Sequence, residues 1–184
     1  IGIFDTHKLS KLVSITSGDL MVTLEKMKAI YTKMNIADAN FDLTFSLADI
    51  LILGKNVYYE DPEDFEIKLS LNKKDVDYLI KAKNALADVN SMIIKSTRNL
   101  DGDLECGFIF GDNTGFSNKI TYNILGEIDH DNIEIPFNSD IFRDILNSNK
   151  DMDGGTLKLS ENGMLKLNFF SEDIESEYFL ARNE

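Results

Sequence analysis

A short apolar segment followed by an amphipathic helix occurs three times along the chain. The apolar segments span residues 2–4, 65–69 and 133–136, and the helices predicted after them span residues 6–16, 72–89 and 139–149. Because the copies are spaced by roughly 65 residues, they indicate one supersecondary unit that is used repeatedly. Such repetition is typical of a protein that serves as a structural scaffold.

Between the helices, most apolar and polar residues alternate with a period of two, which is typical of half-buried strands. The predicted strands span residues 20–24, 29–31, 41–47, 91–98, 104–110, 119–125, 157–159, 165–167 and 175–182. The Asn162-Gly163 pair predicts a hairpin between two of them. Consecutive strands between helices predict an α+β fold of mostly antiparallel sheets, with the helices on one face.

A segment without periodicity divides the chain. Residues 54–63 contain Pro62, one of only two prolines, and are predicted to be a linker. We therefore assign residues 1–55 and 65–184 to separate domains, with a connector at 56–64. Ile1 lies partway into a strand-like pattern and no leader sequence opens the chain, so we expect further residues upstream.

The charge balance is strongly acidic, at -13 from 32 acidic and 19 basic residues. This balance disfavours a surface that binds nucleic acid everywhere, so any DNA contact must be local. The apolar stretch at 50–53 is far shorter than the about 20 residues of a membrane-spanning helix. Cys106 is the single cysteine, which fits a reducing compartment.

Cations recur on the outer sides of the predicted helices. At 3.6 residues per turn, Val76, Leu79 and Ile80 share one side with Lys83, which we expect to extend its ammonium group to solvent. The other two helices are predicted to bury Leu9, Leu12 and Val13, and Ile141 and Ile145. The outward cations that could contact phosphates, without reading base sequence, are Lys8, Lys11, Lys74, Lys81, Arg143 and Lys150.

An ordinary solvated surface is the alternative interpretation of these cations. Helix surfaces are generally charged, and Asp75, Asp77, Asp140 and Asp144 lie among the lysines and the arginine.

No catalytic or metal-binding arrangement is complete in the sequence. Residues 149–154 resemble the start of a calcium loop, but Ser160 occupies the position of the bidentate glutamate. His130 has no second histidine near it, and Cys106 has no neighbouring base or cation to activate it. Residues 111–115 lack the lysine and helix of a phosphate-binding loop. We expect no enzymatic activity, no cofactor and no metal.

Three segments carry a resemblance to a known family. They are Gly-Ile-Phe-Asp-Thr-His-Lys-Leu-Ser-Lys-Leu-Val at 2–13, Phe-Glu-Ile at 65–67 with Asp-Val-Asp-Tyr-Leu-Ile at 75–80, and Leu-Lys-Leu-Asn-Phe-Phe at 165–170 with Glu-Tyr-Phe-Leu-Ala at 177–181. In these segments the chain resembles the sliding clamps of DNA replication, most closely those of T-even-type bacteriophages. The last segment resembles the closing strand pair and tail of clamps generally.

The resemblance implies a DNA-clamp fold and a ring of three subunits, each of two similar domains, with helices inside and sheets outside. Four strand-helix units would make a full subunit, so residues 1–55 would be the second half of the first domain. The implied function is a processivity factor that encircles duplex DNA in the host cell cytoplasm, is placed there by a clamp loader and tethers DNA polymerase. An apolar pocket for partner peptides would include Val57, Tyr58, Tyr59, Phe179, Leu180 and Ala181.

Ordinary packing is the alternative role of those pocket residues. For the whole chain, the alternative is a non-enzymatic acidic α+β interaction module that binds a host protein, or a DNA mimic. Such a protein would place carboxylates, not lysines, on its functional face. A hydrolase is the least favoured class, because no base-nucleophile pair or metal cluster is found.

Overall fold

A computed structural model describes residues 1–53, 62, 64–111 and 118–183. The chain divides into two compact units, Ile1–Tyr58 and Tyr59–Glu184. The division falls in the predicted connector, most of which lies outside the described residues. The two units are described separately below.

The first unit contains one helix followed by an antiparallel sheet of order β1-β2-β3. Its elements are α1 (Thr6–Val13), β1 (Met21–Met27), β2 (Ile30–Ala37) and β3 (Asp42–Ser46). Asp5 caps α1 by accepting the backbone N–H of Lys8 at 2.8 Å. Leu9, Leu12 and Val13 face the sheet as predicted and pack on a small core around Phe45.

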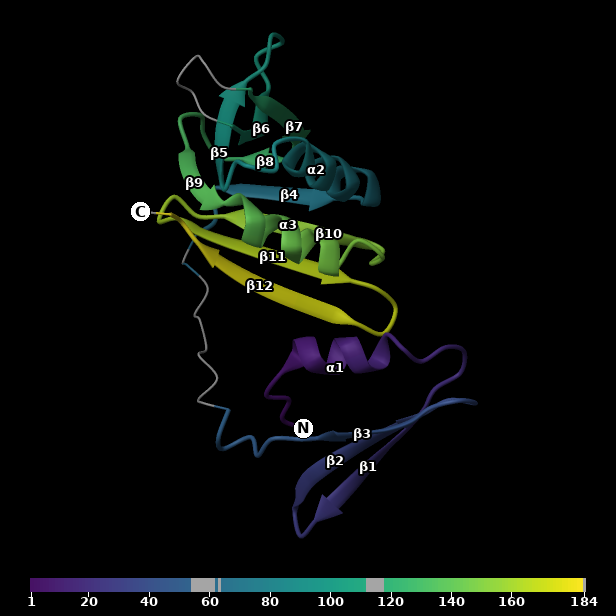
Figure 1. Cartoon of the computed structure of the whole chain (residues 1–184). Helices are drawn as coiled ribbons and strands as arrows, with labels where there is room; N and C mark the ends of the chain where they lie inside the picture. Colours follow the sequence, from purple (N-terminus) through teal and green to yellow (C-terminus); the bar gives the residue numbers. More distant parts are fainter. Residues whose placement is uncertain (54–61, 63, 112–117, 184) are drawn as a thin grey trace. The chain divides into compact units, whose positions relative to one another are not determined.

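The second unit contains two copies of the strand–helix–three-strand pattern. The first copy is β4 (Ile67–Leu71), α2 (Lys73–Ala85), β5 (Ser91–Arg98), β6 (Leu104–Phe110) and β7 (Ile120–Leu125). After the two-residue β8 (Glu127–Ile128), the second copy is β9 (Glu134–Asn138), α3 (Ser139–Ser148), β10 (Gly154–Leu159), β11 (Met164–Phe170) and β12 (Glu175–Ala181). This arrangement confirms the predicted repeat for its second and third copies, whereas the predicted strand at residues 2–4 is only a single bridge between Gly2 and Ala48 (Figure 1).

The two copies exchange their first strands. One sheet has the order β12-β11-β10-β4, extended by β8, and the other has the order β7-β6-β5-β9. All of these pairings are antiparallel. Replacing each element of the first copy by its counterpart in the second converts one order into the other. The unit therefore has internal pseudosymmetry at the level of topology.

The helices of the second unit also share their starting chemistry. Asn72 caps α2 and Asn138 caps α3, and each side chain accepts two backbone N–H groups of the first turn. Asp75 completes a capping box by accepting the backbone N–H of Asn72 at 3.0 Å. Equivalent caps at equivalent positions fix where both helices leave their strands.

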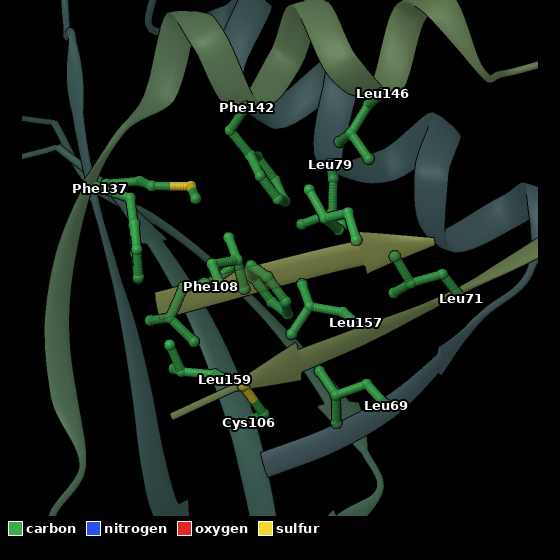
Figure 2. Close-up of a cluster of buried hydrophobic side chains, with 14 of the residues drawn as sticks. Leu69, Leu71, Leu79, Cys106, Phe108, Phe137, Phe142, Leu146, Leu157 and Leu159 are labelled. Atoms are coloured by element: carbon green, nitrogen blue, oxygen red, sulfur yellow. The ribbon is translucent and has the colours of Figure 1, made fainter. Parts of the chain in front are cut away.

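A single core joins both sheets and both helices of the second unit. In β4, β10 and β11 every second residue is buried, so one face of the sheet forms the floor of this core. Figure 2 shows Leu79 of α2 and Phe142 and Leu146 of α3 directed toward strand residues such as Leu157. The predicted α+β architecture, with helices on one side of the sheets, is thus confirmed.

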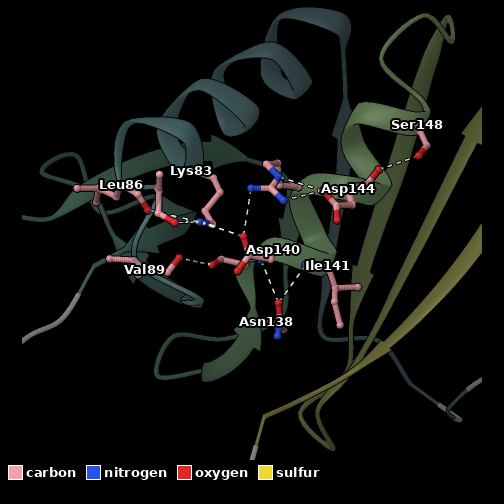
Figure 3. A network of polar contacts seen from close by, with 11 residues as sticks. Lys83, Leu86, Val89, Asn138, Asp140, Ile141, Asp144 and Ser148 are labelled. Atoms are coloured by element: carbon pink, nitrogen blue, oxygen red, sulfur yellow. Dashed lines mark hydrogen bonds and ion pairs between the residues drawn. The ribbon is translucent and has the colours of Figure 1, made fainter.

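Two predictions of side-chain direction were wrong. Lys83 does not extend to solvent: its side chain is fully buried, and its Nζ lies 3.1 Å from the carbonyl oxygen of Ala87 and 3.2 Å from Asp140 Oδ1 (Figure 3). Ile141 does not face the core either, because it is 48% exposed and Phe142 takes the inward position. The helix is rotated relative to the expected one so that the larger aromatic ring is buried.

Candidate nucleic-acid interface

Two lysines and a tyrosine form a cluster on the outer side of α2. Lys74, Tyr78 and Lys81 are spaced by four and three residues, which places them on one face of the helix. The Nζ atoms of Lys74 and Lys81 lie 5.5 and 5.7 Å from the centroid of the Tyr78 ring. Both distances are within the range of cation–π attraction, so the ring holds the two ammonium groups near each other.

The cations of this cluster are not neutralised. Lys74 and Lys81 are exposed, and neither forms an ion pair within the described ranges 1–53, 62, 64–111 and 118–183. Their charges are therefore available to an anionic ligand such as a phosphate group.

Tyr122 of β7 packs against the tyrosine of this cluster. Its ring meets that of Tyr78 edge-on, with centroids 5.6 Å apart, and its hydroxyl donates to Asp75 Oδ1 at 2.8 Å. Desolvation, with the carboxylate of Asp75, raises the pKa of Tyr122 to about 12, so the hydroxyl keeps its proton at neutral pH. Tyr122 thereby connects Asp75 of the α2 capping box to the ring of Tyr78.

Arg143 on α3 is in a different electrostatic state. Its guanidinium contacts Asp144 Oδ1 at 2.8 Å and Asp140 Oδ1 at 3.1 Å, and its side chain is only 26% exposed. The hydrogen bond to Asp144, together with both carboxylates, raises the pKa of Arg143. The predicted outward cation is thus already paired, and a phosphate would have to compete with two carboxylates.

The remaining predicted DNA contacts lie elsewhere. Lys150 is exposed just after α3. Lys8 and Lys11 are exposed on α1, in the first unit. The structure therefore brings Lys74 and Lys81 together and places Arg143 on the adjoining helix, which α2 contacts through the Lys83–Asp140 pair.

Of the predicted partner-binding residues, Val57, Tyr58 and Tyr59 lie outside the described residues. Phe179 and Ala181 occupy alternate positions of β12 that face away from the core. Leu180 lies between them in the opposite direction and is 8% exposed, within the core. In the described part, a peptide at this edge can therefore meet Phe179 and Ala181 but not the side chain of Leu180.

Sequence reasoning missed Tyr78 and Tyr122. The signal for Tyr78 was its spacing between Lys74 and Lys81, which places all three on one helical face. No comparable signal existed for Tyr122, because it reaches the cluster from β7 through tertiary packing.

Among the described residues there is neither a metal-binding cluster nor an activated thiol. No group of three or more His, Cys, Asp or Glu side chains among them could hold a metal ion. Burial raises the pKa of Cys106 to about 12, which disfavours the reactive thiolate. Asn149, the first residue of the calcium-like motif, is buried and donates to the carbonyl oxygen of Ile145 at 2.7 Å.

No helix in the described part of the chain is long and apolar enough to cross a membrane.

The chain is similar to known proteins in its fold and not in its sequence. No family model and no curated protein sequence matches the chain. Among solved structures, proliferating cellular nuclear antigen from Entamoeba histolytica is 18% identical, with a TM-score of 0.69 over 96% of this chain and 69% of its own length. PCNA from Thermococcus kodakaraensis is 15% identical, with a TM-score of 0.69 over 98% of this chain and 72% of its own. The chain thus has the sliding-clamp fold that the resemblance implied.

Proposed function

We propose that this chain belongs to a sliding-clamp subunit of a T-even-type bacteriophage. The subunit would act without enzymatic activity in the host cell cytoplasm, as a homotrimer that encircles duplex DNA and tethers the replicative DNA polymerase. The observation that carries the proposal is the clamp fold, in which Lys74 and Lys81 of α2 are exposed and form no ion pair with any residue that the structure describes. Placement on DNA would require a clamp loader.

The proposed mechanism depends on topology more than on affinity. A closed ring keeps DNA inside without tight contacts, so a few phosphate contacts suffice and the ring can slide. The contacts would come from Lys8, Lys11, Lys74, Lys81, Arg143 and Lys150, with Arg143 contributing least because it is already paired. Phosphate contacts carry no base identity, which suits a protein that must move along any sequence. Polymerase and loader peptides would bind near Val57, Tyr58, Tyr59, Phe179, Leu180 and Ala181.

The oligomeric state tests the ring. The full-length subunit is expected to sediment at about three times its monomer mass, since cyclic symmetry closes a ring of three identical copies. A strictly monomeric full-length subunit at micromolar concentration would contradict the proposal.

Charge reversal tests the DNA-facing surface. We expect the double variant Lys74→Glu and Lys81→Glu, in the full-length subunit, to reduce processive synthesis by polymerase and loader on primed circular DNA. The salt dependence of DNA binding, as the slope of log K against log salt, should fall by about 2, one for each lost phosphate contact. Lys73→Glu is the matched control, because Lys73 lies on the same helix but pairs with Asp153 at 3.5 Å. Unchanged processivity in the double variant would remove these lysines from the DNA interface.

The acidic interaction module is the second candidate, and the net charge of -13 favours it. It predicts a monomer whose binding is lost when surface carboxylates, not Lys74 and Lys81, are neutralised. The two experiments above therefore separate the candidates.

A further inference from the structure

Three lysines lie side by side on the sheet face that points away from α2 and α3. Lys68 of β4 is the register neighbour of Lys158 of β10, which is the neighbour of Lys166 of β11. The residues on either side of each lysine, such as Leu157 and Leu159, point into the core. The alternation of the strands therefore directs all three ammonium groups outward in one row.

This row is unusual because cross-strand neighbours of like charge destabilise a sheet. Lys166 is compensated, since its Nζ lies 2.9 Å from Glu177 Oε1 and 5.1 Å from the ring centroid of Phe179. Lys158 places its Nζ 5.8 Å from the ring centroid of Phe65. Neither Lys68 nor Lys158 pairs with a carboxylate in the part of the chain that the structure describes. Glu127 of β8 is the other register neighbour of Lys68, but no ion pair joins them among the described residues, so a single carboxylate lies beside two cations.

A hollow lies beside these two lysines. It has a volume of about 300 Å³ and is lined by Lys68, Leu69, Ser70, Leu125, Gly126, Glu127, Thr156, Leu157 and Lys158. Leu125 is 67% exposed at its rim. A Cβ on Gly126 would lie 2.6 Å from the carbonyl oxygen of Lys68, so the close approach of this segment to β4 requires glycine. The hollow therefore combines an exposed apolar side chain with two ammonium groups that form no ion pair among the described residues.

We propose that this hollow binds an acidic segment of a partner protein. Carboxylates of the segment would contact Lys68 and Lys158, and an apolar side chain of the segment would cover Leu125. Neighbouring strands lie about 4.8 Å apart and an extended chain rises about 3.3 Å per residue, so acidic residues separated by one or two positions match the two lysines.

The lining of the hollow favours a peptide over nucleic acid. Glu127 lies in the hollow and repels a ligand whose charge is uniformly negative, whereas a peptide can keep its carboxylates on the lysines alone. Leu125 likewise offers nothing to a phosphate backbone. The proposal goes beyond the proposed function, because the hollow lies on the sheet face that points away from α2, which carries Lys74 and Lys81, and because it does not require a ring.

The test measures binding by fluorescence anisotropy. The probe is a labelled peptide of about 12 residues in which Asp and Glu alternate with Leu and Phe, long enough to cross four strands. We expect the chain carrying Lys68→Gln and Lys158→Gln to bind this peptide about tenfold more weakly, because two solvent-exposed ion pairs are lost. Lys73→Gln, a cation at the start of α2 already paired with Asp153, should leave binding unchanged.

Thermal unfolding supplies a second readout. The double variant relieves the repulsion of Lys158 by its two lysine neighbours but loses the attraction between Lys68 and Glu127, so its unfolding temperature should stay close to that of the wild type while its peptide affinity falls. Lys158→Arg keeps the charge and should retain binding. The proposal is overturned if the double variant binds the peptide like the wild type, or if a duplex oligonucleotide binds more tightly than the peptide with the same dependence on these lysines. A subunit that fails to form trimers yet binds the peptide would refute the proposed ring and leave this site standing.

Discussion

At the scale of single residues, the most consequential side chain is Lys83. It lies in the last turn of α2, where a cation complements the partial negative charge of the helix end, and it binds the carbonyl oxygens of Leu86 and Ala87. Its ion-pair partner Asp140 lies in the first turn of α3, where an anion is favoured. This ion pair, buried only on its lysine side, thus joins the end of one helix to the start of the next (Figure 3).

The two members of this pair should respond differently to mutation. Asp140→Ala leaves a fully buried ammonium without its carboxylate and should destabilise the fold by about 3 kcal/mol. Lys83→Met should cost about 1–2 kcal/mol, because the carbonyl oxygen of Ala87 loses this donor, whereas that of Leu86 still accepts the N–H of Val89 and the Asp140 carboxylate, at 42% exposure, can be hydrated. Urea unfolding at neutral pH measures both values.

Lys81→Met is the control for this comparison, since Lys81 is exposed on the same helix and should change stability by less than about 0.5 kcal/mol. A larger loss for Lys83→Met than for Asp140→Ala would show that the ammonium is not desolvated as described.

At the scale of helices and strands, the contact between two loops depends on a histidine. His130, between β8 and β9, places Nε2 2.9 Å from Oε1 of Glu161, in the turn between β10 and β11. The carbonyl oxygen of Asp131, 2.9 Å from Nδ1, and then the nearby carboxylates raise the pKa of His130 above its ordinary value of 6.5. The contact therefore stabilises the fold when His130 is protonated.

This contact makes stability depend on pH in one direction. Because the folded-state pKa is the higher one, the stabilisation is complete below about pH 6.5 and disappears as the pH rises through the folded pKa. We expect wild type and His130→Gln to differ most in unfolding temperature at acidic pH and to converge at alkaline pH. Glu161→Gln should reduce the same difference, and a gap between wild type and His130→Gln that widens with pH would reverse the assignment.

The sequence predicted elements better than it predicted their contacts. The period of two located β10 and β11 because Leu157 and Leu165 lie in alternating runs, whereas β8 has two residues and leaves no period to detect. A helical wheel placed Lys83 correctly on the buried side, but it could not show that Asp140 would come from α3 to pair with it. The lysine row could not be predicted either, since a lysine between two apolar residues is ordinary in each strand until the register places Lys68 beside Lys158.

At the scale of the whole molecule, the two units differ in how much apolar surface they bury. In the second unit one continuous core includes both helices and both sheets, whereas the described part of the first unit has three buried core residues, Met34, Ile36 and Phe45. All residues of β1 are exposed, including Met21 and Met27. Regions with few buried contacts open more easily.

Hydrogen exchange should reveal this difference. We expect backbone amides of β10 and β11 to exchange only through global unfolding, and amides of β1 to exchange orders of magnitude faster through local opening. A fragment of residues 62–184 should unfold in a single cooperative transition, because it retains the whole of that continuous core. Equal protection of β1 and β11, or a non-cooperative fragment, would contradict this assignment.

The exchange of β4 and β9 between the two sheets has a consequence for ancestry. The sheet of each half contains the first strand of the other half: β9 pairs with β5, and β4 pairs with β10. One half on its own would therefore expose an unpaired strand edge. Two separate copies of one shorter chain could satisfy both edges by trading their first strands, as domain-swapped dimers do. If the gene of such a chain were duplicated and the two copies fused, the strand pairings of the swapped dimer would all be preserved. The segment that links β7 to β9 would then be the only new piece of backbone.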